Sequence, residues 1–377
     1  YDTQHSLEDW VRESQRYQAE AVRIMTEAYR RDNRMVSFAY HLFIDAFPEG
    51  WTKTLMDVDR NPKKAFFAYR DALEPVMVSL RTDRFRLFSG ETAKIECWLC
   101  NDTDDFLPDY RVKYQVLLGE NMINAGSGAC RPEACGSCFQ GFISFLVPHV
   151  TKRTGCKIQA ALLDAAGQMV NSTELSLEIF PEKMEFNRNV CFLGEMEARW
   201  TTLQNDLQWT GIPLEETGPG DTIVVAGGKA YTEQKEAILS RVLRGTALIL
   251  MELEEGVYDI GGEEIRVKNC SMLPLHFASR DTGHELADGF EPDDIRYWYD
   301  EEAGYVTPLL ERTFTSDSFH EIVTCGNQDE EGCWRKVMAV GERSYGRGKI
   351  AVCQLKLAGR TATNPTARKL AERLLSM

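Results

Sequence analysis

The chain opens with a segment in which apolar residues recur every three or four positions. Such spacing places them on one face of an amphipathic helix. Ser6 stands at the N-cap position, and Glu8 and Asp9 follow in the first turn, where the helix dipole favours acids. We therefore predict a helix over residues 6–31 with a single packed face, formed by Leu7, Trp10, Val11, Ser14, Gln18, Ala21, Val22, Met25, Ala28 and Tyr29.

The next segment has the pattern of the end of an α/β unit. Met35 to Ile44 is apolar and aromatic with little polarity, as expected for a strand buried on both sides. A turn is predicted at Phe47 to Gly50, and a second helix begins at Asn61-Pro62, with proline at the first helical position. Because a single unit cannot cover its own strand, we expect its packing partners to lie outside this chain.

Between about Val76 and Pro181 the apolar period changes from helical spacing to strict alternation. Turn residues such as Ser89-Gly90 and Ala166-Gly167 separate the alternating runs. About seven short strands over roughly 100 residues are typical of an immunoglobulin-like sandwich. The runs that predict these strands include residues 76–80, 92–99, 111–118, 142–147, 157–163 and 175–179.

From about residue 187 onward, predicted strands alternate with predicted helices. The strand Asp221 to Ala226 runs into Gly227-Gly228, and we expect Thr232 to cap the following helix and Gly245 to end it. This order indicates a doubly wound, flavodoxin-like α/β domain. The other predicted elements are strands at 190–193, 246–251 and 349–355 and helices at 201–209 and 365–375. The predicted fold class is thus multidomain α/β plus β, with boundaries at 1–75, 76–182 and 187–377.

Charge and composition exclude two classes of partner. Acidic residues outnumber basic residues 58 to 43, with a net charge of −15, which argues against nucleic acid. The longest apolar runs, such as Ala247 to Met251, are far shorter than the ~20 residues that span a bilayer, so we expect no membrane partner. The chain begins at Tyr1 without an initiator methionine or a signal peptide, and we interpret it as a fragment or a processed product.

The cysteines favour a reducing compartment. There are eleven, an odd number, and several lie in apolar strand-like runs, among them Cys191 and Cys353. Buried thiols in such runs behave as small hydrophobic side chains. We therefore expect free cysteines and a cytoplasmic protein.

The first 80 residues resemble the close of the catalytic barrel in family 2 glycoside hydrolases. Two runs carry the resemblance: His41 to Asp45 followed by Phe47 to Trp51, and Asp57 to Tyr69 with its Pro-Lys-Lys-Ala-Phe-Phe core. In that family the eighth strand ends in an aromatic–Asp segment, and a loop leads through a Pro-Lys-x-Ala-aromatic sequence into the last helix. A generic α/β unit is the alternative reading of the same pattern.

The resemblance implies a retaining glycosidase whose catalytic residues are not in this chain. Family 2 enzymes use two glutamates at the ends of the fourth and seventh barrel strands, with carboxyl groups about 5–5.5 Å apart. Residues 1–377 begin after the place where the seventh strand would end. We therefore assign no catalytic residue and expect no hydrolysis from this chain alone, although the remainder of the catalytic domain would be its partner.

Part of a substrate platform remains in the segment that carries the resemblance. Barrel active sites are built from strand ends and the loops after them, which makes His41, Asp45 and Trp51 the substrate-binding candidates. The family commonly has tryptophan near the position of His41, and this difference leaves the sugar open. The alternative is structural, with His41 packed in the barrel and Trp51 covering its rim.

The last segment resembles the glutamine-amidotransferase-like domain appended to some β-galactosidase-type enzymes, through residues 284–289 and 345–355. An active amidotransferase needs a cysteine on a strained turn after a central strand. After Ala247 to Leu250 this chain instead has Met251-Glu252-Leu253-Glu254. We expect a domain that serves packing or oligomerisation. We interpret Gly227-Gly228 as a tight strand-to-helix turn in preference to a phosphate site.

No cofactor or metal is predicted. Cys130, Cys135 and Cys138, with Cys97 and Cys100, have spacing that suits zinc or an iron–sulfur cluster. However, residues three apart on a strand face opposite sides, and we interpret 130–138 as a loop between strands. A disulfide among these cysteines stays open. The acidic stretches at 291–294 and 329–331 lack an alternating ligand pattern, and we interpret them as solvated loops.

Three functions follow from these patterns. We favour a C-terminal part of a β-glycosidase that acts on carbohydrate, in which the sandwich and the α/β domain brace the barrel or join subunits of a homo-oligomer. The second is a non-catalytic carbohydrate- or protein-interaction module, which would have no reason to keep an orphan strand at Met35 to Ile44. The third is a degenerate amidotransferase-like hydrolase, which the missing cysteine disfavours.

Overall fold

The computed structural model describes residues 4–47, 53–130, 132–272 and 278–377. The chain is multidomain and mostly β, and it divides into two compact units. Residues 4–181 form the first and residues 182–377 the second. The first unit contains both the predicted barrel segment and the predicted sandwich.

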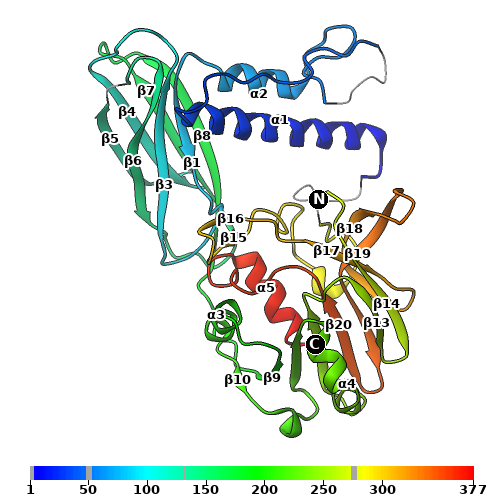
Figure 1. Ribbon diagram of the computed structural model, residues 1–377. Coiled ribbons are helices and arrows are strands. Elements are labelled where there is room, and N and C mark those ends of the chain that lie inside the picture. The colour runs from blue at the N-terminus through cyan, green and yellow to red at the C-terminus, as the bar shows by residue number, and fades with distance from the viewer. Residues whose placement is uncertain (1–3, 48–52, 131, 273–277) are drawn as a thin grey trace. The chain divides into compact units, whose positions relative to one another are not determined.

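Two helices lead the first unit. Helix α1 spans Leu7–Arg31, and the side chain of Ser6 accepts a hydrogen bond from the Asp9 amide, so the predicted cap is confirmed. Helix α2 spans Lys64–Ala72 and packs alongside α1 (Figure 1). It begins two residues later than predicted, because Pro62 forms a bridge with Met56 instead of occupying the first helical turn.

The predicted strand at Met35 to Ile44 is wrong. Residues 35–43 form no strand, and only an isolated parallel bridge joins Ile44 to Met56. Val36 is 97% exposed. A barrel strand is held by hydrogen bonds to a strand on each side. The described part of this chain supplies neither neighbour, so the segment has the sequence of a buried strand without its pairing.

Eight strands complete the first unit as two facing sheets, in the orders β1-β3-β6 and β2-β8-β7-β4-β5. Alternate residues from both sheets, such as Ile95, Ile143 and Ile158, form one core between them. This arrangement agrees with the prediction of a β-sandwich over residues 76–182. The strands are β1 Val76–Arg81, β2 Arg86–Phe88, β3 Thr92–Asn101, β4 Tyr110–Leu118, β5 Asn121–Cys130, β6 Gly136–Leu146, β7 Thr154–Leu163 and β8 Met169–Phe180.

The sandwich corrects the interpretation of 130–138 as a loop. Cys130 is the last residue of β5, and Cys138 lies inside β6, so only the residues between these strands are a connection. Strand β5 was not predicted because small residues such as Gly126 and Gly128 hide its alternation. At Gly126 a Cβ atom would lie 2.6 Å from the Tyr114 ring on the paired strand, which explains the glycine.

The second unit is built on a ten-stranded sheet. Five parallel strands stand side by side in the order β10-β9-β11-β12-β20, which is 2-1-3-4-5 in chain order, and antiparallel strands continue the sheet beyond β20. Its strands are β9 Asn189–Leu193, β10 Thr210–Gly211, β11 Thr222–Ala226, β12 Ala247–Met251, β13 Gly256–Ile260, β14 Glu263–Asn269, β17 Arg312–Thr315, β18 His320–Gln328, β19 Trp334–Tyr345 and β20 Gly348–Cys353; a separate pair is β15 Tyr299–Asp300 and β16 Tyr305–Val306.

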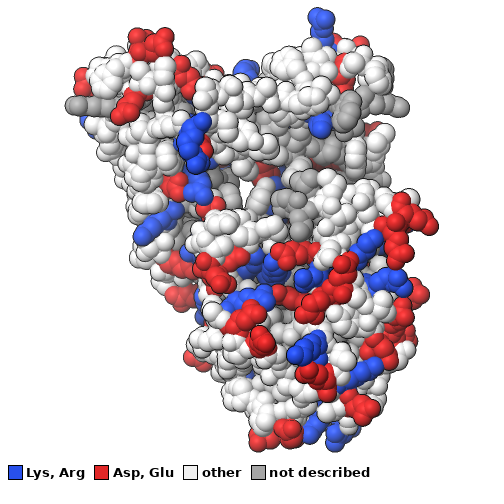
Figure 2. All heavy atoms as spheres, viewed as in Figure 1, with Lys and Arg blue, Asp and Glu red and all other residues white. Residues whose placement is uncertain are grey.

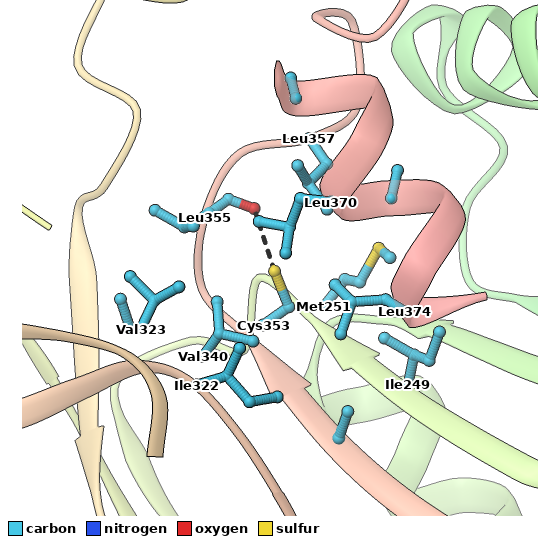
Figure 3. Close-up of a cluster of buried hydrophobic side chains, with 14 of the residues drawn as sticks. Ile249, Met251, Ile322, Val323, Val340, Cys353, Leu355, Leu357, Leu370 and Leu374 are labelled. Carbon is cyan, nitrogen blue, oxygen red and sulfur yellow. Dashed lines mark hydrogen bonds between the residues drawn. The ribbon is translucent and has the colours of Figure 1, made fainter. Parts of the chain in front are cut away.

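Helices cover both faces of the parallel strands. Ile249 and Met251 point to the core shared with α3 (Ala198–Leu207) and α5 (Pro365–Leu374), where Leu370 and Leu374 pack (Figure 3). Leu248 and Leu250 of the same strand point to the other core. That core contains α4, Gly228–Val242, through Tyr231, Ile238 and Val242. Two short 3-10 helices lie at Leu214–Glu216 and Glu285–Ala287.

The cap predicted for α4 is wrong. Gly227, with φ 84°, is the N-cap, and Thr232 lies within the helix, where its hydroxyl donates to the Gly228 carbonyl. Helix α4 begins directly after the β11 turn because only glycine fits this conformation without strain. Gly245, with φ 118°, lies in the turn after the helix end.

Charge is distributed unevenly over the surface. On the face seen in Figure 2, the second unit carries interspersed acidic and basic side chains. The part of the first unit that carries α1 and α2 shows few charged side chains on this face. Among the described helices, none is both long enough and apolar enough to cross a membrane.

Candidate functional site

The candidate site in the first unit centres on the carboxylate of Asp45. Its Oδ2 accepts hydrogen bonds from the Thr54 hydroxyl at 2.8 Å and from the Lys63 ammonium at 3.1 Å. Lys63 also donates to Thr54 at 2.6 Å. The side chains of Asp45 and Lys63 are 13% and 15% exposed, so this ion pair is largely shielded from water. The three residues fix the end of the Leu42–Asp45 segment against the start of α2.

Helix α1 braces the same network from behind. The side-chain amide of Gln18 donates to the carbonyls of Lys53 and Thr54 and to the Tyr40 hydroxyl, at 2.7 to 3.0 Å. Tyr40 in turn donates to the Lys53 carbonyl at 2.6 Å. These bonds hold the loop before α2 in one position, which is a condition for precise ligand orientation.

The three substrate-binding candidates are not brought together by the structure. Asp45 is the centre of the network, whereas the His41 side chain is exposed and makes no hydrogen bond to Asp45 within the described segments. Trp51 lies outside the described residues. Sequence reasoning missed Thr54 as a partner of Asp45. Lys63 belongs to the Pro-Lys-Lys run that carries the family resemblance, so the sequence does mark this residue.

One oxygen of the Asp45 carboxylate has no partner among the described residues. Its Oδ1 is buried and accepts no hydrogen bond within the described part of the chain. An ionised carboxylate has about four lone-pair sites. The network therefore has capacity for one more donor, such as a hydroxyl group or a protein amide.

Apolar residues around this site are exposed. The predicted single packed face of α1 is packed in part only: Val22 is buried, but Leu7, Trp10 and Met25 are 72%, 49% and 52% exposed. Phe43 and Phe47 are 49% and 60% exposed as well. Large contiguous apolar patches mark binding or docking faces, which makes these residues candidates for one.

Among the described residues, the five cysteines between 97 and 138 do not all gather at one point. Cys97 belongs to the sandwich core, whereas Cys100 lies near Arg30 and Arg31 of α1, so the two face opposite sides of β3 as predicted. Burial raises the pKa of the Cys97 thiol to about 12, which keeps it protonated. All eleven cysteines are free.

One acidic group lies in the turn between β18 and β19. Ligand atoms of Asp329, Glu331 and Cys333 lie within 4.8 Å of one another. Asp329 Oδ1 accepts from the backbone amides of Glu331 and Cys333, at 3.0 and 2.8 Å. The group is therefore explained by the hairpin turn, in line with a solvated loop.

Comparison with known proteins gives matches among solved structures only. No protein-family model and no curated protein matches this chain. An exo-chitosanase from Amycolatopsis orientalis is 18% identical over 46% of this chain and 20% of its own length, with a TM-score of 0.35. A β-D-mannosidase from Dictyoglomus thermophilum is 16% identical over 52% of this chain and 23% of its own, with a TM-score of 0.38. The chain thus spans less than a quarter of these proteins.

Proposed function

We propose that this chain is the C-terminal part of a retaining β-glycosidase whose two catalytic glutamates lie outside residues 1–377. The observation that carries the proposal is the Asp45 network. Asp45 and Lys63 belong to the two sequence runs that resemble the end of the family 2 barrel, and the structure joins them by an ion pair at 3.1 Å. Barrel active sites are built from strand ends and the loops after them, and Asp45 ends the apolar run that would be the last strand of a complete barrel.

The exposed apolar residues support the same proposal. Helix α1, the segment before Asp45 and helix α2 have the composition of an α/β unit but leave Leu7, Val36 and Phe47 at the surface. The remainder of an α/β barrel is the partner that would cover them. In this proposal the chain by itself serves assembly, and hydrolysis requires the complete barrel.

Substrate contact is assigned to three residues within this proposal. Asp45 is assigned from its place at the end of the motif, where Thr54 and Lys63 hold its carboxylate in one orientation. His41 and Trp51, which belong to the same sequence motif, would contact the sugar once the barrel is complete.

The second unit is proposed to be flavodoxin-like and related to the amidotransferase-like domains. The parallel strand order 2-1-3-4-5 supports this, since it is the order of flavodoxin-like sheets. No amidotransferase activity is proposed, because Glu252 stands at the turn after β12 where the nucleophilic cysteine would be required.

Hydrolysis of a panel of nitrophenyl β-glycosides tests the proposal. The panel is given to this chain and to a version extended upstream until it includes a whole barrel. We expect activity in the extended protein only, and we expect Asp45→Asn in that protein to raise KM more than it lowers kcat. Activity of the short chain on any of these glycosides would overturn the placement of the catalytic pair.

A further inference from the structure

The turn after β12 is strained in the way a catalytic elbow is, although it carries no nucleophile. Glu252 directly follows Met251, the last residue of β12, and has φ 54°. A positive φ is uncommon for a residue other than glycine and strains the backbone. Strain of this kind is retained where the rest of the structure enforces it, and it clusters at ligand sites.

A cavity of about 560 Å³ lies beside this turn. Gly194, which follows β9, Gly227, which follows β11, and Glu252 line it. It therefore lies at the carboxyl ends of three neighbouring parallel strands. In the order β10-β9-β11-β12, the chain reverses direction across the sheet between β9 and β11, and ligands of open α/β sheets bind at such a point.

Glycines allow close packing in the wall of this cavity. A Cβ atom at Gly194, where φ is 139°, would lie 2.9 Å from the Ala226 carbonyl oxygen, so the ends of β9 and β11 approach closely only without a side chain. At Gly227 a Cβ atom would lie 2.8 Å from Glu254 Oε1. The close approach places the backbone of both strand ends in the wall of the cavity.

The N-terminus of α4, which would otherwise suit an anion, is already occupied. The Gly228 amide donates to Glu254 Oε2 at 2.7 Å, so a carboxylate of the chain itself lies where a phosphate would bind. This excludes a phosphate ligand at that position. It also confirms the interpretation of Gly227-Gly228 as a tight turn.

Acidic groups exceed basic groups in the lining. Arg199 lies between two of the acidic side chains, 2.5 Å from Glu252 Oε2 and 2.7 Å from Glu197 Oε2. The other oxygen of Glu252, Oε1, is buried and has no hydrogen-bond partner among the described atoms. Lys229 lies 3.9 Å from Glu233. The complete charged lining is Glu195, Glu197, Glu233, Glu252 and Glu254 against Arg199, Lys229 and Arg312.

We propose that this cavity binds a small molecule that carries an ammonium group, with the Glu252 turn as the centre of the site. The excess of carboxylates supplies the attraction, and the filled α4 N-terminus excludes an anion. The volume is within the range of small-molecule sites. The inference concerns the second unit alone and does not depend on the proposed glycosidase function.

Three probes built on one sugar ring separate the charge classes: glucosamine, glucose and glucose 6-phosphate. Binding to the full chain is measured by isothermal titration calorimetry at low salt. We expect glucosamine to bind about ten-fold more tightly than glucose, the factor that one additional charge interaction gives. Equal affinity for glucosamine and glucose, preference for glucose 6-phosphate, or no heat with glucosamine would each overturn the proposal.

Two variants locate the binding. Glu252→Gln keeps the size of the side chain, and Glu195→Gln changes an exposed lining residue that cannot disturb the core. Each should weaken glucosamine binding several-fold, whereas Glu264→Gln, which removes an exposed charge from β14, should not. If Glu252→Gln fails to fold, Glu195→Gln decides: unchanged affinity in that variant contradicts a site in this cavity.

Discussion

At the scale of single residues, the second unit depends on a buried cation. Arg360 is 2% exposed in its side chain and lies 3.1 Å from Asp300 Oδ2. It also donates to the Trp298 carbonyl at 3.0 Å and to the Thr307 hydroxyl at 2.6 Å. Burial lowers the pKa of Arg360 and the Asp300 charge opposes this, so a full set of acceptors is what makes the buried cation tolerable.

Removing this cation should be costly. We expect Arg360→Met to lower the free energy of unfolding by about 3 kcal/mol, because Asp300 and the carbonyl groups lose their donor. The matched control is Arg335→Met, whose ion pair with Asp329 has an arginine 61% exposed, and which should change stability by less than ~1 kcal/mol. Urea unfolding monitored by circular dichroism measures both, and equal effects would contradict the argument.

The partner of Arg360 gives a pH dependence with a defined sign. Burial raises the pKa of Asp300. Hydrogen bonds from Thr307 and the Ala303 amide, together with the Arg360 charge, lower this pKa by more than burial raises it, so the net shift is downward. In the unfolded protein the pKa of an aspartate is about 3.9. Because the pKa of Asp300 is lower in the folded protein, its ionised carboxylate stabilises the fold above a pH of about 3.9, and this stabilisation is lost as the pH falls through the folded pKa.

Comparison with a variant isolates this effect. The difference in unfolding free energy between wild type and Asp300→Asn should be largest near neutral pH and shrink as pH falls below about 4. Asp317→Asn, at an exposed acid, should show no such trend. Urea titrations over this pH range measure the difference, and a gap for Asp300→Asn that stays constant with pH is the contrary result.

Single residues also show what sequence alone could find in the candidate site. Asp45 was identified because it ends an apolar run within a recognisable motif. Thr54 was not, because its contact with Asp45 depends on how the loop folds, and loop polarity carries no such information. The positive φ of Glu252 was equally hidden, since nothing in Met-Glu-Leu-Glu marks a strained turn.

At the scale of elements, close packing of turns against strands is the main constraint in the second unit. Gly348 begins β20, and a Cβ atom there would lie 2.2 Å from the Thr246 carbonyl oxygen and 2.5 Å from that of Val242. Both are backbone atoms, which cannot rotate away. The start of β20 and the end of α4 therefore approach each other only through glycine.

Substitution at this contact should be strongly destabilising. We expect Gly348→Ala to lower the melting temperature markedly, with a loss of about 3 kcal/mol or more, since overpacking a core contact costs about 1–3 kcal/mol even where side chains can shift. Gly211→Ala on β10 is the control, because its Cβ would meet only the Gln204 side chain at 3.7 Å. Thermal denaturation compares the two, and similar melting temperatures would refute the packing argument.

How well an element can be predicted from the sequence depends on whether its own residues show the pattern of its burial. Helices α1 and α5 and strand β3 follow from the periodicity of their apolar residues, and β12 follows from its unbroken apolar run. The segment Met35 to Ile44 has an equally clear pattern but forms no strand, because pairing needs neighbours that no local pattern supplies. Strand β5 fails in the opposite direction, since it is paired on β4 although its small residues hardly alternate.

At the scale of the whole molecule, the exposed apolar face of α1 defines the central question. If a complete barrel covers this face, amide hydrogen exchange across residues 7–31 should be slower in the extended protein than in this chain. Amides of β7, inside the sandwich, should exchange alike in both and serve as the internal control. Equal exchange of α1 in the two proteins would mean that the face has another role.

The most direct test of the account combines activity and stereochemistry in one measurement. Proton NMR follows the hydrolysis of a nitrophenyl β-glycoside by this chain and, separately, by the extended protein, and it identifies the anomer released first. The account predicts no hydrolysis by this chain and initial release of the β-anomer by the extended protein. Hydrolysis by this chain, or initial release of the α-anomer by the extended protein, would contradict it.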